Sequence, residues 1–381
     1  MEARFPPSVD AEWVEQTLQE GEGEDLQLHV GEWQGCQLFG EARLLQWLAT
    51  VTWSGHTVDV ILKSGLPEIE DDPRHQVWMM LRDTLGATVL IDSARSVTDE
   101  DGRDRHQEVV GVQWSRLRAE GGDVGFGRER ALVAIDRRGA PAAFSAFREG
   151  VGEFDRTEQR LRSLVERLGL ENVGSLPLEW LTSFARELIE NTREHAITDL
   201  AGERFEGLRF LQLRRLSVAK PLQMEGLLPS AEGPVQAFLD RLSQSGDLAR
   251  GQAAQFVELT VTDVGVGIPA RLLDTEDVYS DPLAAELEVT LRAMRPNESS
   301  KAATVMGRGQ GLHNALEVAE LLRGLVVMRT GRHELLYDTT EPAPAGQDGW
   351  HIQTRGYARG TGVSVLVPWW PAAQSELAQA S

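Results

Sequence analysis

The spacing of apolar residues in the second half of the chain predicts an ordered succession of helices and strands. Residues 257–263 alternate apolar and polar side chains, which predicts a half-buried strand. A helical pattern follows Leu312, and a closing strand is predicted at residues 363–368. Further upstream, an apolar stripe at helical spacing predicts a helix that packs on a sheet. The stripe consists of Leu181, Phe184, Leu188 and Ile189.

In the first 147 residues, short strands and helices alternate. Strands are predicted at 26–30, 57–63, 87–91, 108–117 and 131–135, and helices at 42–53 and 75–85. Such alternation is typical of an α/β layer domain. We therefore expect residues 1–147 to form an α/β domain. Its role is not predicted, because no nucleophile with a base, no metal-ligand spacing and no phosphate loop stands out in it.

One predicted helix carries three polar residues on a common face. Glu187, Asn191 and His195 recur every four residues and so lie above one another. A carboxylate can accept a proton from water, and a carboxamide oxygen is a hard, neutral ligand that suits Mg²⁺. On its own, this pattern is more typical of a solvated helix face. A histidine in such a place more often packs or bonds locally, so we assign His195 no catalytic role.

Two glycine-rich turns follow. Asp263 ends the predicted strand, where it can accept a hydrogen bond from an exocyclic amine, and Gly265 and Gly267 would let a flat ring approach the backbone. The segment 307–312 opens the next helix, where free N–H groups and the helix dipole favour phosphate. A Walker loop does not fit, because the chain has no Gly-Lys-Ser/Thr sequence. A dinucleotide fingerprint would need glycine in place of Leu312.

In order and spacing, these segments resemble the motifs of the Bergerat-fold (GHKL) ATP-binding family, which joins type II topoisomerases, heat-shock chaperones, histidine kinases and mismatch-repair ATPases. The resemblance covers about residues 150–370 and includes Gly360-Thr361 before the closing strand. It implies an α/β fold in which a C-terminal Bergerat-type α/β sandwich, with a mixed sheet and helices on one face, follows the smaller α/β domain. We place this ATP-binding domain at 148–371 and a polar tail at 372–381.

The resemblance implies roles at the two ends of a bound Mg·ATP. Asn191 would bind Mg²⁺, which bridges the phosphates. Asp263 would bind the adenine amine, with support from Thr361. Gly265 and Gly267 would shape the adenine pocket.

A further set of residues would hold the phosphates. Backbone N–H groups would come from Gly309, Gly311 and Leu312. Residues 270–306 would form a lid that closes over the nucleotide. Lys301 would contact a phosphate from this lid, judged by its position alone, and Arg308 is an alternative for the same contact.

Glu187 narrows the implied chemistry. Histidine kinases usually carry asparagine at this position. Hydrolytic members of the family, and the serine kinases that regulate sigma factors, carry a glutamate that acts as general base. We therefore expect a slow Mg-dependent ATPase whose nucleotide state controls lid closure and contact with a partner. Two alternatives stay open, namely a serine/threonine protein kinase of the anti-sigma-factor type and a nucleotide-sensing binding module without chemistry.

Residues 197–256 are a longer connection than compact members of the family have. They include a predicted strand at 208–213 and a predicted amphipathic helix at about 235–245. This insertion is either a partner surface or a decoration of the fold.

Composition limits the partners. The net charge of −21, from 38 basic and 59 acidic residues, argues against duplex binding, which rests on Lys and Arg. A single cysteine, Cys36, excludes an internal disulfide and fits a reducing compartment. The sequence shows no apolar run long enough for a membrane span and no secretory signal layout. We expect a cytoplasmic protein that binds adenine nucleotide and a protein partner, without nucleic acid or membrane, and a homodimer stays open.

Overall fold

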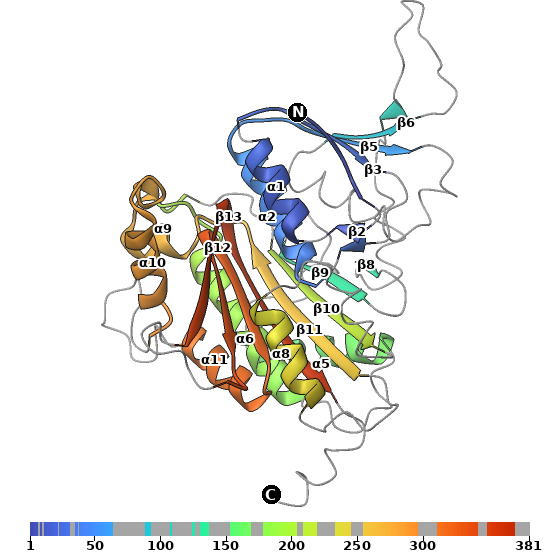
Figure 1. The fold of residues 1–381 in the computed structure, drawn as a ribbon, viewed down its shortest axis with the longest axis vertical. Helices are drawn as coiled ribbons and strands as arrows, with labels where there is room; N and C mark the ends of the chain where they lie inside the picture. Colours follow the sequence, from blue (N-terminus) through green and yellow to red (C-terminus); the bar gives the residue numbers. More distant parts are fainter. Residues whose placement is uncertain are drawn as a thin grey trace, which may run out of the picture.

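The computed structural model describes residues 1–6, 8–9, 11–21, 23–30, 35–36, 38–63, 88–92, 107–108, 124–125, 130–136, 153–168, 178–203, 209–218, 233–244, 254–295, 311–341 and 349–369. Within these residues the fold is mixed α/β, with a largely parallel sheet, an antiparallel sheet and several helices (Figure 1). None of the described helices is long and apolar enough to cross a membrane.

The N-terminal sheet has the strand order β1-β3-β5-β6-β7. The first four of these strands are parallel and β7 is antiparallel to β6; they comprise β1 (Glu2–Arg4), β3 (Leu26–Val30), β5 (Val58–Lys63), β6 (Thr88–Asp92) and β7 (Gln107–Glu108). Parallel neighbours need crossover connections, which α1 (Ala11–Glu20) and α2 (Gly40–Trp53) supply. A separate pair of short strands consists of β2 (Ser8–Val9) and β4 (Gly35–Cys36).

The expected α/β alternation is therefore confirmed in this part of the chain. The strands predicted at 26–30, 57–63 and 87–91 and the helix predicted at 42–53 are all present. Helix α1 was not predicted. The predicted helix at 75–85 and most of the predicted strand at 108–117 lie outside the described residues.

The C-terminal sheet has the order β12-β13-β11-β10-β9-β8. Its strands are β8 (Val124–Gly125), β9 (Arg130–Asp136), β10 (Arg209–Val218), β11 (Ala254–Asp263), β12 (Leu325–Asp338) and β13 (Trp350–Trp369). Every described pair of neighbours is antiparallel, so the expectation of a mixed sheet is wrong. Strands β8 and β9 precede the predicted domain boundary at residue 147, yet they belong to this sheet. The sheet therefore contains strands from both sides of that boundary.

Three helices cover the first face of the antiparallel sheet, namely α5 (Glu153–Arg167), α6 (Leu178–His195) and α11 (Gly311–Leu321). The apolar stripe of α6 is buried as predicted: Phe184 is 0 % exposed and packs with Val261 and Val365 of the sheet in one core. These helices fix the face on which the polar residues of α6 meet the ends of β11 and β13.

The second face of this sheet is covered as well, so the expectation of helices on one face only is wrong. Helix α8 (Pro234–Gln244) buries Phe238, Leu239 and Leu242 against the sheet. The helix predicted within residues 197–256 thus contributes to a core. Helices α1 and α2 also pack on this face, against β11, β12 and β13, and lie between the two sheets (Figure 1).

This second layer corrects the expectation of a half-buried strand at 257–263. Its polar side chains are buried too, since Glu258, Thr260 and Thr262 are at most 2 % exposed. The Phe39 N–H at the start of α2 donates to Glu258 Oε1 at 3.2 Å, and Thr260 bonds to Ser364 of β13 at 2.7 Å. Buried polar groups are stable when they are hydrogen-bonded in this way.

Candidate functional site

A cavity of about 270 Å³ opens where α6, α11 and the short helix α9 (Ile268–Leu273) meet the ends of β11 and β13. Seven residues that the sequence indicated line it, namely Glu187, Asn191, Asp263, Gly267, Gly311, Leu312 and Thr361. Chain segments that are far apart in sequence therefore contribute to a single cavity.

Of the predicted site residues that the structure describes, Gly265 does not line the cavity. Gly265 lies beside it, where a Cβ would come within 2.9 Å of Ala196 Cα, so the turn needs glycine to pack against the end of α6. Lys301, Arg308 and Gly309 lie outside the described residues.

Helix α6 presents its polar face to the cavity because its apolar face is buried on the sheet. The side chain of Glu187 is 16 % exposed, and its Oε1 accepts from Arg186 Nη2 at 2.9 Å. His195, two turns further on, also lines the cavity, and its Nε2 lies 3.8 Å from Glu194 Oε2. Glu187 is thus a carboxylate at the cavity wall that pairs with a neighbouring cation.

Asn191 lies against the first turn of α11. A Cβ placed on Gly311 would come within 2.7 Å of Asn191 Oδ1, so only glycine permits this approach. The first N–H groups of a helix have no partner within the helix and carry a partial positive charge. The side chain of Asn191 and these N–H groups therefore meet at one end of the cavity.

Asp263, at the end of β11, also lines the cavity and is 7 % exposed. Its Oδ1 accepts from the Gly265 N–H at 2.9 Å and from the Thr361 N–H at 3.3 Å. Burial raises the pKa of Asp263 to about 6, although the two N–H donors and the charges of Arg209 and Arg271 act in the opposite direction. Both of these hydrogen bonds end on Oδ1, which leaves Oδ2 to accept from a ligand.

Thr330 of β12 connects the two chain segments next to Asp263 by hydrogen bonds. This residue was not predicted from the sequence. Its hydroxyl accepts from the Ile268 N–H at 3.1 Å, donates to Gly360 O at 3.2 Å and lies 3.3 Å from Thr361 Oγ1. A Cβ on Gly267, whose φ is 86°, would come within 3.2 Å of the same hydroxyl. One threonine therefore bonds to both the glycine turn and the closing strand.

Arg271 of α9 also lines the cavity and was missed by the sequence analysis. It donates to three carbonyl groups at and just after the end of α6: Nε to His195 O at 3.0 Å, Nη1 to Asp199 O at 3.1 Å and Nη2 to Thr198 O. Burial lowers the pKa of Arg271. The residue fastens α9 to α6, and a lone arginine after a glycine turn gives no sequence signal for that contact.

The first part of the predicted lid, residues 270–295, folds as the end of α9, the 3₁₀ helix η1 (Glu276–Tyr279) and α10 (Leu283–Arg292). Glu286 of α10 is 0 % exposed, and its Oε1 accepts from the Arg332 N–H of β12 at 2.7 Å. Tyr279 donates to Val266 O at 2.6 Å. These contacts attach η1 and α10 to β12 and to the glycine turn before α9, and residues 296–306 of the predicted lid lie outside the described residues.

A metal ion at this site would depend on few protein ligands. Within the described ranges, no group of three or more His, Cys, Asp or Glu side chains could hold a metal ion. Asn191 offers a single neutral oxygen beside the start of α11, so the other ligands would have to come from a bound anion or from water.

No model of a known protein family, no curated protein and no solved structure matches the chain. The function of the cavity therefore has to be inferred from its own residues.

Proposed function

We propose that this protein binds Mg·ATP in the cavity and hydrolyses it slowly, and that residues 148–371, with β8 and β9 added to their sheet, form a variant of the Bergerat-type sandwich with a second covered face. One observation carries the proposal: Asn191, Asp263, Gly311 and Thr361 come from α6, β11, α11 and β13 and line the same cavity. The family resemblance requires this convergence, and four separate motifs would not reach one cavity in an unrelated fold except by coincidence.

The end of the cavity around Asp263 suits adenine. Oδ1 is occupied by two backbone N–H groups, so Oδ2 is the acceptor for the exocyclic amine. Apolar side chains that include Val261, Ile268 and Val363 line the same cavity and suit the faces of a flat ring. The volume of about 270 Å³ lies near the lower limit of small-molecule pockets, about 300 Å³.

The end around Asn191 suits the phosphates. The N–H groups at the start of α11 attract anions, and Asn191 Oδ1 lies beside them. When bound, Mg²⁺ would neutralise phosphate charge there. Asn191 would hold the ion by one oxygen, and the first turn of α11 would orient the phosphates.

Glu187 lies one helical turn before Asn191 and would take the proton from the attacking water. Its carboxylate lines the cavity, which favours chemistry over a module that only senses nucleotide. The same carboxylate would take a proton from a serine or threonine hydroxyl of a protein substrate. Incubation with γ-labelled ATP separates the two reactions: phosphate released to water supports hydrolysis, and label on a protein supports a kinase.

Binding itself is tested by calorimetric titration with a non-hydrolysable ATP analogue and Mg²⁺. In Asp263→Asn the two backbone N–H groups would hold the amide oxygen, so Nδ2 would face the adenine amine with donor against donor. We expect affinity to fall by about tenfold or more, the loss typical of a hydrogen bond to a charged group. Asp240→Asn on the exposed side of α8 is the matched control. No uptake by the unmodified protein at millimolar analogue would overturn the proposal.

A further inference from the structure

Helix α2, from the N-terminal part of the chain, bonds directly to β13, which lines the cavity, and to the neighbouring strand β12. Gln46 is 0 % exposed, and its Nε2 donates to Arg329 O of β12 at 3.1 Å and to Arg359 O of β13 at 3.4 Å. The Arg359 N–H donates to Thr50 Oγ1 at 2.8 Å. The Arg359 guanidinium lies 3.4 Å from the ring centre of Trp53. Three consecutive turns of α2 thus contact β12 and β13 in the region where these two strands pair.

The pairing of β12 with β13 contains a bulge in this region. Thr330 is opposite Thr361, but the next residue, Gly331, is opposite Ala358. Two residues of β13 therefore have no partner on β12, and one of them, Gly360, has φ 80°. Bulges re-aim neighbouring side chains and are common next to functional sites. The hydrogen bonds from α2 end on this bulge and on the residue before Thr330.

The bulge is in turn bonded to the base end of the cavity. A Cβ on Gly360 would collide with the carbonyl of Asp263, so the two backbones are in close contact. Thr330 Oγ1 donates to Gly360 O and accepts from the Ile268 N–H. The next residue of β13, Thr361, donates its N–H to Asp263 Oδ1. A displacement of the bulge would therefore change the surroundings of Asp263.

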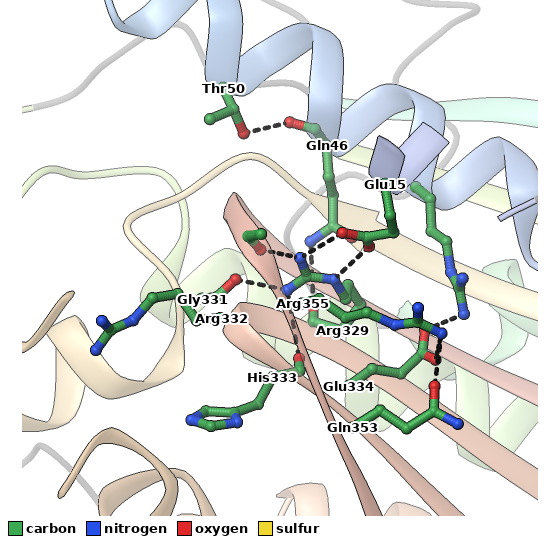
Figure 2. A network of polar contacts seen from close by, with 12 residues as sticks. Glu15, Gln46, Thr50, Arg329, Gly331, Arg332, His333, Glu334, Gln353 and Arg355 are labelled. Carbon is green, nitrogen blue, oxygen red and sulfur yellow. Dashed lines mark hydrogen bonds and ion pairs between the residues drawn. The ribbon is translucent and has the colours of Figure 1, made fainter. Parts of the chain in front are cut away.

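Buried ion pairs hold α1 and α2 on the sheet beside this bulge (Figure 2). Arg329 Nε donates to Glu15 Oε1 of α1 at 3.0 Å, and Arg43 of α2 pairs with Glu334 of β12. All four side chains are at most 7 % exposed. In Figure 2, Glu15 and Gln46 approach Arg329 from the two helices that cross the strands. The helices are thus attached to β12 on the side of the sheet opposite the cavity.

We propose that α2 is a working part of the nucleotide site, in which Gln46 and Thr50 are positioning residues that hold the bulge and, through it, the Thr361 N–H against Asp263. This inference rests on the proposed nucleotide binding. It assigns the N-terminal part of the chain a role in setting affinity for the base. If α2 only covered the sheet, removal of one of its hydrogen bonds would leave the pKa of Asp263 unchanged.

The test uses two matched variants of the full-length protein. Thr50→Val keeps the shape of the side chain and removes the acceptor for the Arg359 N–H. Thr52→Val removes a hydroxyl from the same helix that bonds only to Leu48 O at 3.0 Å and Ala49 O at 3.1 Å, within α2 itself. Affinity for a non-hydrolysable ATP analogue with Mg²⁺ is measured by calorimetry between pH 5 and pH 8.

We expect Thr50→Val to weaken binding by about two- to tenfold, the range for loss of one neutral hydrogen bond. We also expect the midpoint of the pH dependence to move upward, because the displaced Thr361 N–H no longer stabilises the carboxylate of Asp263. Thr52→Val should leave both quantities unchanged. The upward shift is the result that a structural role alone would not produce.

The other charged groups around Asp263 are the same in the unmodified protein, Thr50→Val and Thr52→Val. Arg209 of β10 and Arg271 of α9 act on its carboxylate, and Glu194 and His195 of α6 line the same cavity. Because histidine titrates in the same pH range, the comparison is repeated in a His195→Gln background.

Gln46→Leu is the second test variant, should Thr50→Val fail to fold, and melting curves check both. If the unmodified protein binds the analogue and both test variants match Thr52→Val in affinity and pH midpoint, the positioning role is wrong and nucleotide binding stands. If the unmodified protein takes up no analogue, the proposed function fails, and this inference fails with it.

Discussion

Asp263 and Thr361 lie directly opposite each other on β11 and β13, and the Thr361 N–H donates to Asp263 Oδ1 at 3.3 Å. The Gly265 N–H donates to the same oxygen at 2.9 Å. Backbone groups thus fix the orientation of a buried carboxylate, and its second oxygen remains for a ligand. Because burial raises the pKa of this carboxyl to about 6, the proposed binding of adenine at Asp263 should depend on pH.

We expect affinity for the ATP analogue to rise between pH 5 and pH 7, with a midpoint near pH 6. Burial raises the pKa of Asp263 to about 6, so below that pH the carboxyl is protonated. Because Oδ1 accepts two N–H bonds, the proton would lie on Oδ2, which then meets the adenine amine as a donor. Calorimetry at several pH values measures the midpoint. If Asp263→Asn shows the same pH midpoint of affinity as the unmodified protein, another group causes the pH dependence.

The same pKa predicts how this residue affects stability. A carboxyl whose pKa is higher in the folded than in the unfolded protein binds protons preferentially in the folded state. Its contribution to stability is therefore fully present below about pH 4, and it declines as the pH rises to about 6. Urea unfolding at pH 4.5 and pH 7 should show a smaller decline in Asp263→Asn than in the unmodified protein. An equal decline in both would show that other groups set it.

Gly311→Ala should impair the metal-bound state. The added Cβ would lie 2.7 Å from Asn191 Oδ1, which has to move away from the start of α11. We expect about a tenfold loss of affinity for the analogue with Mg²⁺ and a smaller loss when EDTA replaces the metal. The titration without metal is the control, because it measures the cost of the methyl group to the fold and the phosphates alone. Equal losses in both titrations would argue against Asn191 as a metal ligand.

Glu187→Gln should separate binding from turnover. A general base contributes about 100- to 10,000-fold to rate, so phosphate release should fall by that factor while analogue affinity stays within about twofold. Glu190→Gln is the matched control, since Glu190 lines the same cavity one turn away from the position of the base. Unchanged phosphate release by Glu187→Gln would mean that this carboxylate is not the base.

Arg271→Lys should loosen the wall formed by α9. A lysine ammonium cannot reproduce the planar set of donors that reaches His195 O, Thr198 O and Asp199 O. We expect a loss of about 1–3 kcal/mol in unfolding free energy and weaker binding of the analogue. Arg162→Lys on the exposed side of α5 is the control. Full stability in Arg271→Lys would show that the three carbonyl contacts are not what holds α9.

Much of the local structure follows from sequence spacing. The apolar stripe of α6 and the alternation in β11 locate both elements, because each depends only on the period of its own side chains. The glycine turns likewise locate the site, since Gly267 and Gly311 are required where another part of the chain comes very close. Arg271 and Thr330 could not be found in this way, because their partners come from distant segments.

The sequence by itself determined the positions of α6, β11, α11 and the end of β13, because periodicity and glycine positions are local properties, and the family resemblance singled out seven of the residues that line the cavity. Strand β12 and helix α10 were not predicted. Only the tertiary structure decided what covers the second face of the antiparallel sheet. Glu258 and Thr260 look like exposed positions of a half-buried strand, yet α2 buries them, together with polar partners such as Ser364. Whether a polar side chain faces water or a hydrogen-bonding partner depends on which remote segment packs on it, and strand alternation carries no information about that segment.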